Sequence, residues 1–265
     1  MVAVVRFLVT NDDSYASPGL YLLYRAALGL GDVLVFSTES PRSVIGHTIT
    51  LSRPLRVYRM RVRGVEVHLT DGTPVDVVHL AVNVLGFRPD FVLSGINVGE
   101  NLSLQHIFYS GTVAAAIESA VMGIPAIAFS ADVESFEEME TAEMESIAMQ
   151  YLRRIIEIVS KRGLPRGVDL LNVNIPNPRR FRSCVEVTTA SRVRWLSRYE
   201  GRKDPSGRPY YWLSMSKVAA EPGTDVYATE VMGCISVTPL SIDLNAGARG
   251  AEELKRIVRE AFQQV

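Results

Sequence analysis

Residues 4–14 read VVRFLVTNDDS, and this stretch indicates the fold class of the whole chain. Apart from Arg6, every residue from 4 to 9 is apolar, with no alternation of polar and apolar side chains. Such a run is typical of a buried parallel strand, both faces of which are covered. The run ends in polar residues that include the adjacent carboxylates of Asp12 and Asp13.

The two adjacent carboxylates predict a ligand site. Like charges repel each other, and placing them at the end of a buried strand raises that cost. A hard cation is the simplest compensation, since carboxylate oxygens suit magnesium, manganese or calcium. In open α/β sheets, ligands also bind at the carboxyl ends of strands. The alternative is a plain turn in which Asp12 and Asp13 only cap the backbone.

The composition narrows the class of protein. The chain has 265 residues and a net charge of −1, so no polyanion-binding surface is indicated and no nucleic-acid duplex is expected as a partner. No apolar run reaches the ~18 residues that a membrane span needs, and we expect no secretory signal peptide, because Met1 leads directly into the first strand. The two cysteines, Cys184 and Cys234, are too few for a disulfide framework, which predicts reduced thiols in a cytoplasmic protein.

Strand and helix patterns alternate along the first two thirds of the chain, which predicts a doubly wound, mostly parallel sheet of the α/β class. The predicted strands are 4–10, 32–37, 90–94, 126–129 and 170–175, with a hairpin over 55–70. The predicted helices are 20–30, 74–85, 112–122 and 141–162, and residues 95–111 are expected to form a long loop.

The pattern changes after Pro176, so we divide the chain there. Residues 1–176 are expected to form the catalytic core. Residues 177–265 form an extension that contains two further strands, a segment rich in arginine and aromatic residues around a Pro-Ser-Gly turn, and a terminal amphipathic helix over 252–264.

Two further side chains are expected beside the acids. If the strands follow the common order 3-2-1-4-5, the loops that carry Ser43 and Asn97 flank the first strand. A hydroxyl, an amide oxygen and two carboxylates form a partial shell for a hard cation. The alternative is that Ser43 and Asn97 are ordinary turn residues.

The segment Ser110-Gly111-Thr112 precedes a helix that begins with small residues, and its free N–H groups suit a phosphate. Ser110 or Thr112 can instead simply cap the helix. His106 lies nearby and is a candidate proton donor, although a packing role is the alternative.

Five spaced motifs resemble the SurE (survival protein E) family of metal-dependent 5′/3′-nucleotidases. They are LVTNDDS at 8–14, SVIGHTIT at 43–50, GTPVD at 72–76, SGINVGEN at 94–101 and YSGTVAAA at 109–116. The segments PYYW, GTD and ISVTPL, at 209–212, 223–225 and 235–240, resemble the carboxyl-terminal region of the same family.

The resemblance implies a Rossmann-like core whose carboxyl-terminal hairpin and helix are exchanged between the subunits of a homodimer or homotetramer. It implies one divalent cation per subunit, Mg²⁺ or Mn²⁺, with Asp12 and Asp13 as catalytic residues. The implied metal ligands are Asp12, Asp13, Ser43 and Asn97, and the implied phosphate-binding residues are Asn101, Ser110, Gly111 and Thr112. Two positions depart from the family pattern: Ser14 and Val44 stand where the family has glycine.

The expected activity is therefore hydrolysis of nucleoside 5′- and 3′-monophosphates to nucleoside and phosphate. A haloacid-dehalogenase-type phosphatase fits poorly, because its acids are not adjacent and no lysine precedes Lys161 here. The alternatives that stay open are a broad-specificity acid phosphatase and a non-catalytic sensor of nucleotide or metal. The role of each acid as nucleophile, general base or ligand also stays open.

Overall fold

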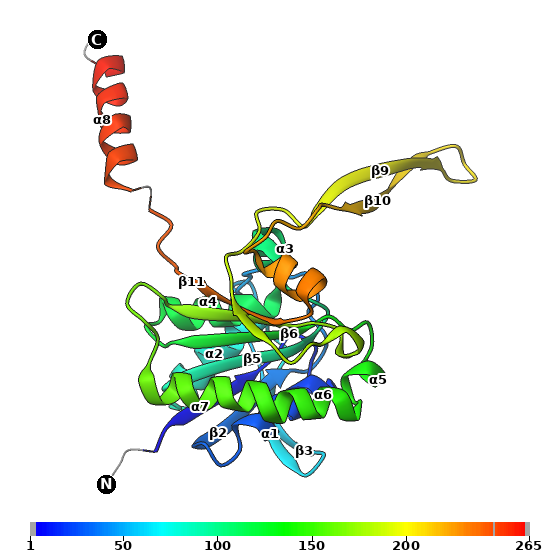
Figure 1. The fold of residues 1–265 in the computed structure, drawn as a ribbon, viewed down its shortest axis with the longest axis vertical. Helices are drawn as coiled ribbons and strands as arrows, with labels where there is room; N and C mark the ends of the chain where they lie inside the picture. The colour runs from blue at the N-terminus through cyan, green and yellow to red at the C-terminus, as the bar shows by residue number, and fades with distance from the viewer. Residues whose placement is uncertain (1–3, 246, 263–265) are drawn as a thin grey trace.

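The computed structural model describes residues 4–245 and 247–262, and in them the chain builds a nine-stranded sheet with helices on both faces (Figure 1). The strands of this sheet are β1 (Arg6–Thr10), β2 (Asp32–Thr38), β3 (Val57–Val62), β4 (Val65–Thr70), β5 (Phe91–Val98), β6 (Ala126–Ala131), β7 (Leu170–Ile175), β8 (Val185–Val187) and β11 (Ile235–Leu240). The helices are α1 (Pro18–Ala27), α2 (Pro74–Asn83), α3 (Ser103–Tyr109), α4 (Gly111–Val121), α5 (Phe136–Met139), α6 (Ala142–Ile147), α7 (Arg153–Arg162) and α8 (Ala248–Phe262). Shorter segments are the π-helical η1 (Ala148–Leu152) and η3 (Tyr227–Met232) and the 3₁₀ turn η2 (Pro178–Arg180).

The strand order is β3-β4-β2-β1-β5-β6-β7-β11-β8, and the central strands are parallel. Strand β1 lies between β2 and β5, with Leu8 beside Leu34 on one side and Val92 on the other. The predicted doubly wound sheet is confirmed, and so is the predicted place of the first strand. The loops that follow β1, β2 and β5 therefore meet at one edge of the sheet.

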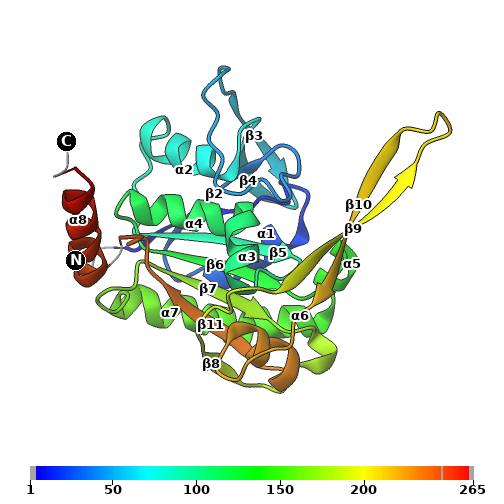
Figure 2. The ribbon, with the colours of Figure 1, turned by 90° about the horizontal axis from the view of Figure 1, so that it is seen from above.

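Helices cover the sheet in two layers (Figure 2). Phe7 and Val9 pack in the cluster that contains residues of α1, α5, α6 and α7, whereas Leu8 packs in the cluster that contains residues of α2 and α4. All three side chains are fully buried. Burial on both faces is the reason that the β1 sequence shows no polar alternation.

Helix α2 begins as the sequence predicts. Thr73 accepts a hydrogen bond from the Asp76 N–H, and the Asp76 side chain accepts one from the Thr73 N–H, so the two residues form a capping box ahead of Pro74. Asp76 also accepts hydrogen bonds from the N–H and the hydroxyl of Thr50. This second role ties the long loop after β2 to the core.

Two predicted segments differ from the structure. Residues 95–111 are not a loop throughout, because β5 continues to Val98 and Ser103–Tyr109 form α3. Glycine and polar residues in this stretch conceal the strand, which pairs Asn97 with Ser130 of β6. The predicted helix over 141–162 runs as α6, η1 and α7, with a π-helical segment in the middle.

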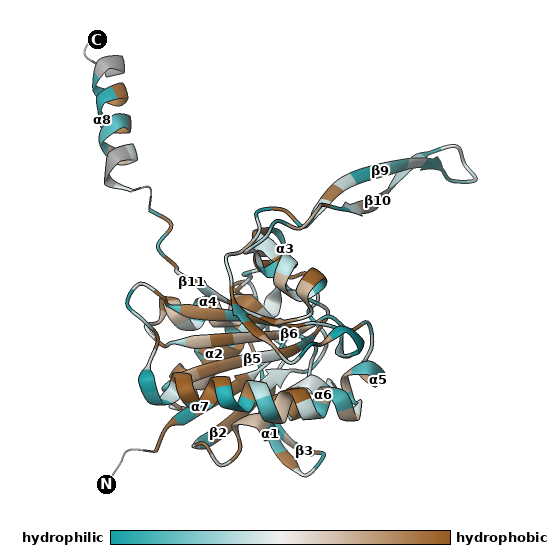
Figure 3. Cartoon of the chain, viewed as in Figure 1, coloured by the Kyte–Doolittle hydropathy of each residue, from teal (hydrophilic) through white to brown (hydrophobic). Residues whose placement is uncertain are grey.

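Beyond Pro176 the chain completes the sheet and then departs from it. Strand β11 pairs with β7, and β8 pairs with β11 at the edge. In contrast, β9 (Trp195–Lys203) and β10 (Pro209–Lys217) form a separate antiparallel hairpin that projects from the body, as does α8 (Figure 1). Hydrophobic residues are interspersed with hydrophilic ones along both projections (Figure 3). Residues 263 and 264, also predicted to be helical, lie outside the described residues.

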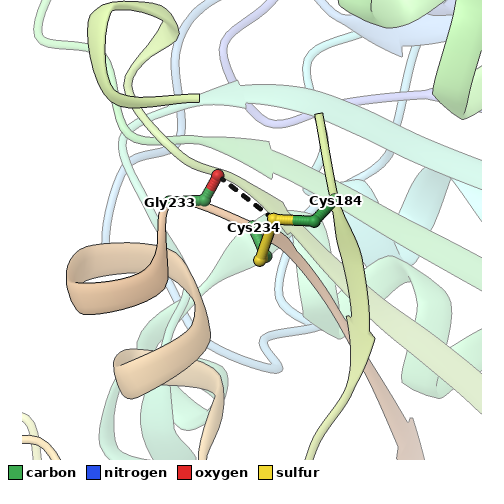
Figure 4. Close-up of a disulfide and its surroundings, with 3 residues drawn as sticks. All are labelled: Cys184, Gly233 and Cys234. Carbon is green, nitrogen blue, oxygen red and sulfur yellow. Dashed lines mark hydrogen bonds between the residues drawn. A yellow bond between two sulfur atoms is a disulfide. The ribbon is translucent and has the colours of Figure 1, made fainter. Parts of the chain in front are cut away.

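The predicted reduced thiols are wrong, because Cys184 and Cys234 form a disulfide (Figure 4). They are 50 residues apart in the sequence. However, each cysteine directly precedes one of two paired strands, and Val185 is the register partner of Ile235. The sheet thus brings the two sulfur atoms together, which the cysteine count alone does not predict.

Candidate active site

The turn after β1 is held by the side chain of Asn11. The Ser37 hydroxyl donates to Asn11 Oδ1 over 2.6 Å, and Asn11 Nδ2 donates to the carbonyl of Ser14 over 2.9 Å. Ser14 itself adopts a left-handed conformation, with φ of 71°. The turn buries Asp12, which is 4% exposed, and leaves Asp13 partly exposed.

Asp12 packs against the first residues of helix α4. The Thr112 hydroxyl donates a hydrogen bond to Asp12 Oδ1. A Cβ atom at Gly111 would lie 2.8 Å from Asp12 Oδ2, so a side chain at position 111 would displace the Asp12 carboxylate. Burial raises the pKa of Asp12, while the Thr112 hydroxyl and the N–H groups of Thr112 and Gly111 act in the opposite direction. The positive end of α4 therefore partly compensates the buried charge.

Asp13 lies at the end of β5. The Val98 N–H donates to Asp13 Oδ2 over 2.9 Å. Burial, followed by repulsion from Asp12, raises the pKa of Asp13 to about 7. Among the described residues, no lysine, arginine or histidine forms an ion pair with Asp12 or Asp13. The two carboxylates thus lack the positive charge that their burial calls for.

A bulge in β5 directs Asn97 toward these acids. Ser94 pairs with Ala128 and Asn97 with Ser130, so β5 advances by one more residue than β6 over this interval. Asn97 Nδ2 donates to the Gly99 carbonyl over 2.7 Å, and Asn97 Oδ1 lies 3.4 Å from the Thr112 hydroxyl. The bulge therefore turns the amide oxygen toward the side of the site where Asp12 lies.

Ser43 reaches the site from the loop after β2. The N–H of Arg42 donates to the Asp12 carbonyl over 2.7 Å, and the Arg42 guanidinium donates to the carbonyls of Asp71 and Gly72. These contacts anchor the loop although Ser43 itself is exposed. A cavity of about 450 Å³ is lined by all four predicted metal ligands, Asp12, Asp13, Ser43 and Asn97.

The four residues predicted to bind phosphate fall into two pairs, one that lines the cavity and one that does not. Asn101 and Ser110 line the same cavity. Gly111 and Thr112 are fully or nearly fully buried behind Asp12, and the Thr112 hydroxyl is engaged by that carboxylate. The Ser110 hydroxyl accepts a hydrogen bond from the Val113 N–H over 3.0 Å, so Ser110 caps α4 as well as facing the cavity.

A buried polar network that the sequence analysis missed fixes Asn101. Asn174 Oδ1 accepts from the Asn101 N–H over 2.8 Å, Asn172 Nδ2 donates to the Asn101 carbonyl over 2.8 Å, and Asn101 Nδ2 donates to the Ser130 hydroxyl. The signal was present in β7, whose sequence LLNVNI places two asparagines in an otherwise apolar buried strand. Buried amides are costly unless they are hydrogen bonded, so such a pair indicates a structural or functional network.

Part of the cavity wall is largely apolar, which the sequence analysis also missed. Tyr109 and Val44 contribute to it, and Leu213 and Met215 reach it from the projecting hairpin. The cavity is therefore polar at the carboxylates and apolar toward the hairpin. A ligand that combines an anionic group with an organic body matches this division.

The donor set fits a hard divalent cation. The described residues contain no group of three or more histidine, cysteine, aspartate or glutamate side chains arranged for a metal, so hydroxyl and amide oxygens are needed beside the two carboxylates. Ser43 and Asn97 supply these two oxygen types on the same cavity wall. An all-oxygen set around two uncompensated carboxylates suits Mg²⁺ or Mn²⁺ rather than a thiolate-binding metal.

Comparison with known proteins identifies the family. The family model described as "Survival protein SurE" matches residues 7–197. The chain belongs to the SurE family. A relative from Thermofilum pendens named "5′-nucleotidase SurE" is 44% identical to it, and the match covers 98% of this chain and 99% of the relative. A relative of the same name from Pyrobaculum arsenaticum is also 44% identical, and the match covers 96% of this chain and 98% of the relative. The crystal structure of the SurE protein from Aquifex aeolicus matches with a TM-score of 0.80 and 38% identity, covering 95% of this chain and 99% of that one.

The two departures from the SurE motifs lie where a glycine would be free of strain. Ser14 has φ of 71° and Val44 has φ of 54°, both in the left-handed region. This region favours glycine, and it is least favourable for a β-branched residue such as valine. The backbone thus keeps the left-handed conformation at both positions although the side chain differs.

Proposed function

We propose that the chain is a divalent-metal-dependent phosphomonoesterase that hydrolyses nucleoside 5′-monophosphates, and 3′-monophosphates, to nucleoside and phosphate. The observation that carries the proposal is the pair of carboxylates, Asp12 and Asp13, which line the cavity and form no ion pair with a lysine, arginine or histidine among the described residues. The name 5′-nucleotidase SurE of the two relatives agrees with this activity.

We propose that Asp12, Asp13, Ser43 and Asn97 hold one divalent cation per subunit, Mg²⁺ or Mn²⁺. When bound, the cation supplies Lewis-acid activation of a phosphoryl oxygen or of the attacking water. Asp12 and Asp13 are the proposed catalytic residues. Their fixed positions, set by Thr112 and the Val98 N–H, mean that the site needs little reorganisation during the reaction.

The proposed phosphate-binding residues are Asn101, Ser110, Gly111 and Thr112. Asn101 and Ser110 face the cavity and are the direct candidates. Gly111 and Thr112 contribute the amino-terminal end of α4, whose positive dipole end serves both the phosphate and Asp12. The apolar wall near Leu213 and Met215 accommodates the nucleoside.

The test of this function is phosphate release with and without a metal. Hydrolysis of nucleoside monophosphates is expected to stop in a chelator and to return when Mn²⁺ or Mg²⁺ is added in excess. Full activity in chelator would contradict the metal site. Binding of the nucleotide without release of phosphate would instead identify a sensor, and equal rates on unrelated phosphate esters would identify a broad-specificity phosphatase.

Replacing Thr112 with valine is expected to weaken metal binding. The change keeps the β-branched shape at a fully buried position but removes the hydroxyl that donates to Asp12. Loss of a hydrogen bond to a charged group costs about 1.5–3 kcal/mol, which corresponds to roughly a 10- to 150-fold higher metal concentration for half-maximal activity. A titration of activity against Mn²⁺ measures this. An unchanged midpoint would show that the Thr112 hydroxyl does not orient Asp12.

We propose that the chain is a homo-oligomer, a dimer or tetramer, held by the carboxyl-terminal extension. The hairpin exposes large side chains, including Tyr211 at 67% and Trp212 at 61%, and α8 exposes Leu254 and Ile257. Aromatic side chains are enriched at protein interfaces. Truncation of the extension at Ser191 would not test this assembly by itself, because it would also remove β11 from the core sheet.

Sedimentation of the full chain at micromolar concentration is expected to show at least a dimer. The double variant Tyr211→Ser/Trp212→Ser changes only exposed hairpin positions and is expected to shift the equilibrium toward monomer. A full-length monomer at that concentration would overturn this prediction.

The described residues contain no helix that is long and apolar enough to cross a membrane.

A further inference from the structure

We propose that His106 is the general acid that protonates the leaving oxygen of the nucleoside. This inference rests on the proposed hydrolysis of nucleoside monophosphates and assigns a residue that the site described above leaves unused. The oxygen that leaves a nucleoside monophosphate is an alkoxide, which is a poor leaving group unless it receives a proton. The roles proposed above for the metal ligands and the phosphate-binding residues do not include donating this proton.

His106 is placed for this role by the cavity wall. It lies on α3 and lines the cavity together with Asp12 and Asp13. Its Nδ1 atom is 3.0 Å from Glu100 Oε2. Its Nε2 atom makes no hydrogen bond within the described part of the chain and is not among the described polar atoms that are buried without a partner. Nε2 is therefore open to solvent on a side chain that lines the cavity.

Glu100 is itself held in place, so it orients the imidazole. Glu100 Oε2 accepts a second hydrogen bond from the Leu102 N–H over 2.9 Å, and Glu100 Oε1 accepts one from Arg194 Nε over 3.3 Å. With Nδ1–H donating to this carboxylate, the ring presents Nε2 as the atom that can give or take a proton. Glu100 is thus a positioning residue for His106.

The base of the hairpin completes the support. Arg194 is 2% exposed and also donates to Glu230, which pairs with Lys217 over 2.7 Å. Two positive and two negative side chains therefore balance in this cluster, in which Arg194 is buried and Lys217 is exposed. Its members are Arg194, Lys217, Glu100 and Glu230. A buried arginine that pairs with two carboxylates is costly to retain without a structural or functional reason.

Two hydrogen bonds and one ring contact connect the base of the hairpin to the helix that carries His106. The N–H groups of Arg194 and Trp195 donate to Gln105 Oε1 over 3.2 and 3.0 Å. The Trp195 ring stacks on the His106 ring, with 6.4 Å between centroids. The imidazole is therefore held from one side by the hairpin and through Nδ1 by Glu100, which restricts its rotation.

The proton balance of the step is simple. As water forms a bond to phosphorus, the bond between phosphorus and the nucleoside oxygen breaks, and its electron pair remains on that oxygen. The imidazolium gives its Nε2 proton to this oxygen, and the nucleoside leaves with a neutral hydroxyl. The proton that the attacking water loses restores the imidazolium. The net reaction consumes one water and yields nucleoside and phosphate.

The test compares two esters that differ in how much their leaving group needs a proton. One is a nucleoside 5′-monophosphate, and the other is p-nitrophenyl phosphate, whose phenolate leaves readily without protonation. His106→Gln keeps a polar side chain that can make hydrogen bonds but cannot release a proton. We expect this variant to lose about 10²- to 10³-fold in kcat with the nucleotide and less than about 5-fold with the aryl ester.

Three further measurements make the outcome decisive. His79→Gln is the matched control, because His79 is also paired with a glutamate, Glu118, over 2.8 Å but does not line the cavity. It is expected to change neither rate. Glu100→Gln is expected to show the same contrast between the two esters as His106→Gln, in weaker form. The circular dichroism of each variant shows that it is folded.

An equal loss with both esters after His106→Gln would overturn the proposal, because it would indicate a structural or binding role. No loss with either ester would overturn it as well. Failure of the proposed nucleotidase function is a separate result, seen in the unmodified protein as absence of phosphate release from nucleoside monophosphates. In that case any alkyl phosphate that the protein does hydrolyse replaces the nucleotide in the same comparison.

Discussion

Replacing Asp13 with asparagine is expected to abolish metal-dependent turnover and, in the absence of metal, to stabilise the fold at about pH 8. Asp13 is one of the two adjacent carboxylates after β1 that line the cavity, and asparagine removes its negative charge at nearly unchanged size. Metal-based stabilisation of the transition state amounts to several kcal/mol, so kcat is expected to fall at least about 10³-fold.

The stability effect follows from the pKa of Asp13, which burial and then repulsion from Asp12 raise from 3.8 to about 7. Between these values the folded state retains a proton that the unfolded state has released. The free energy of unfolding of the metal-free protein therefore falls as the pH rises from about 4, and the loss is complete above about pH 7. The free energy of unfolding falls by at most ~4 kcal/mol for this reason. The fall does not occur in Asp13→Asn, because asparagine does not titrate.

Thermal unfolding in chelator at about pH 5 and about pH 8 measures this effect. The melting temperature of the unmodified protein is expected to be lower at about pH 8 than at about pH 5. This difference is expected to be much smaller in Asp13→Asn. Added Mn²⁺ is expected to stabilise the unmodified protein but not the variant. Asp32→Asn, at the exposed amino end of β2, is the matched control and should retain both activity and the pH dependence. A Mn²⁺-dependent rate in Asp13→Asn equal to that of the unmodified protein would exclude Asp13 from the site.

Removing the disulfide is expected to have the largest effect on stability. Cys184 and Cys234 are separated by 50 residues, and the loop that they close contains the whole hairpin of β9 and β10. A crosslink of this span is expected to stabilise the folded state by about 4 kcal/mol, mainly by restricting the unfolded chain. The double variant Cys184→Ala/Cys234→Ala should therefore unfold at a markedly lower denaturant concentration.

Denaturant unfolding with and without a reductant checks this prediction. The reductant is expected to lower the midpoint of the unmodified protein, provided that it acts during unfolding, and to leave the double variant unchanged. Alanine is preferred to serine because Cys234 is 2% exposed and a buried hydroxyl would add a cost of its own. If the double variant and the unmodified protein unfold at the same midpoint under oxidising conditions, the disulfide does not stabilise the fold.

The sequence by itself determines the central part of the architecture. An unbroken apolar run before Asp12 and Asp13 indicates a strand that is buried on both faces, and such a strand belongs in the middle of a parallel sheet. Local signals such as Thr73 directly before Pro74 likewise indicate the start of α2. The strand order also predicts that the segments carrying Ser43 and Asn97 lie near the acids, because it brings these segments to one edge of the sheet.

Other features depend on contacts between residues that are distant in the sequence, and only the tertiary structure decided them. The pairing of β8 with β11 joins Cys184 to Cys234, and the bulge in β5 turns Asn97 toward Asp12. The environment of His106 depends on Glu100, on Arg194 and on the base of a hairpin some 90 residues further along the chain. Patterns of apolar spacing report which face of an element is buried. They do not report which polar atoms of two distant segments lie within hydrogen-bonding distance, because that is set by the packing of the whole sheet.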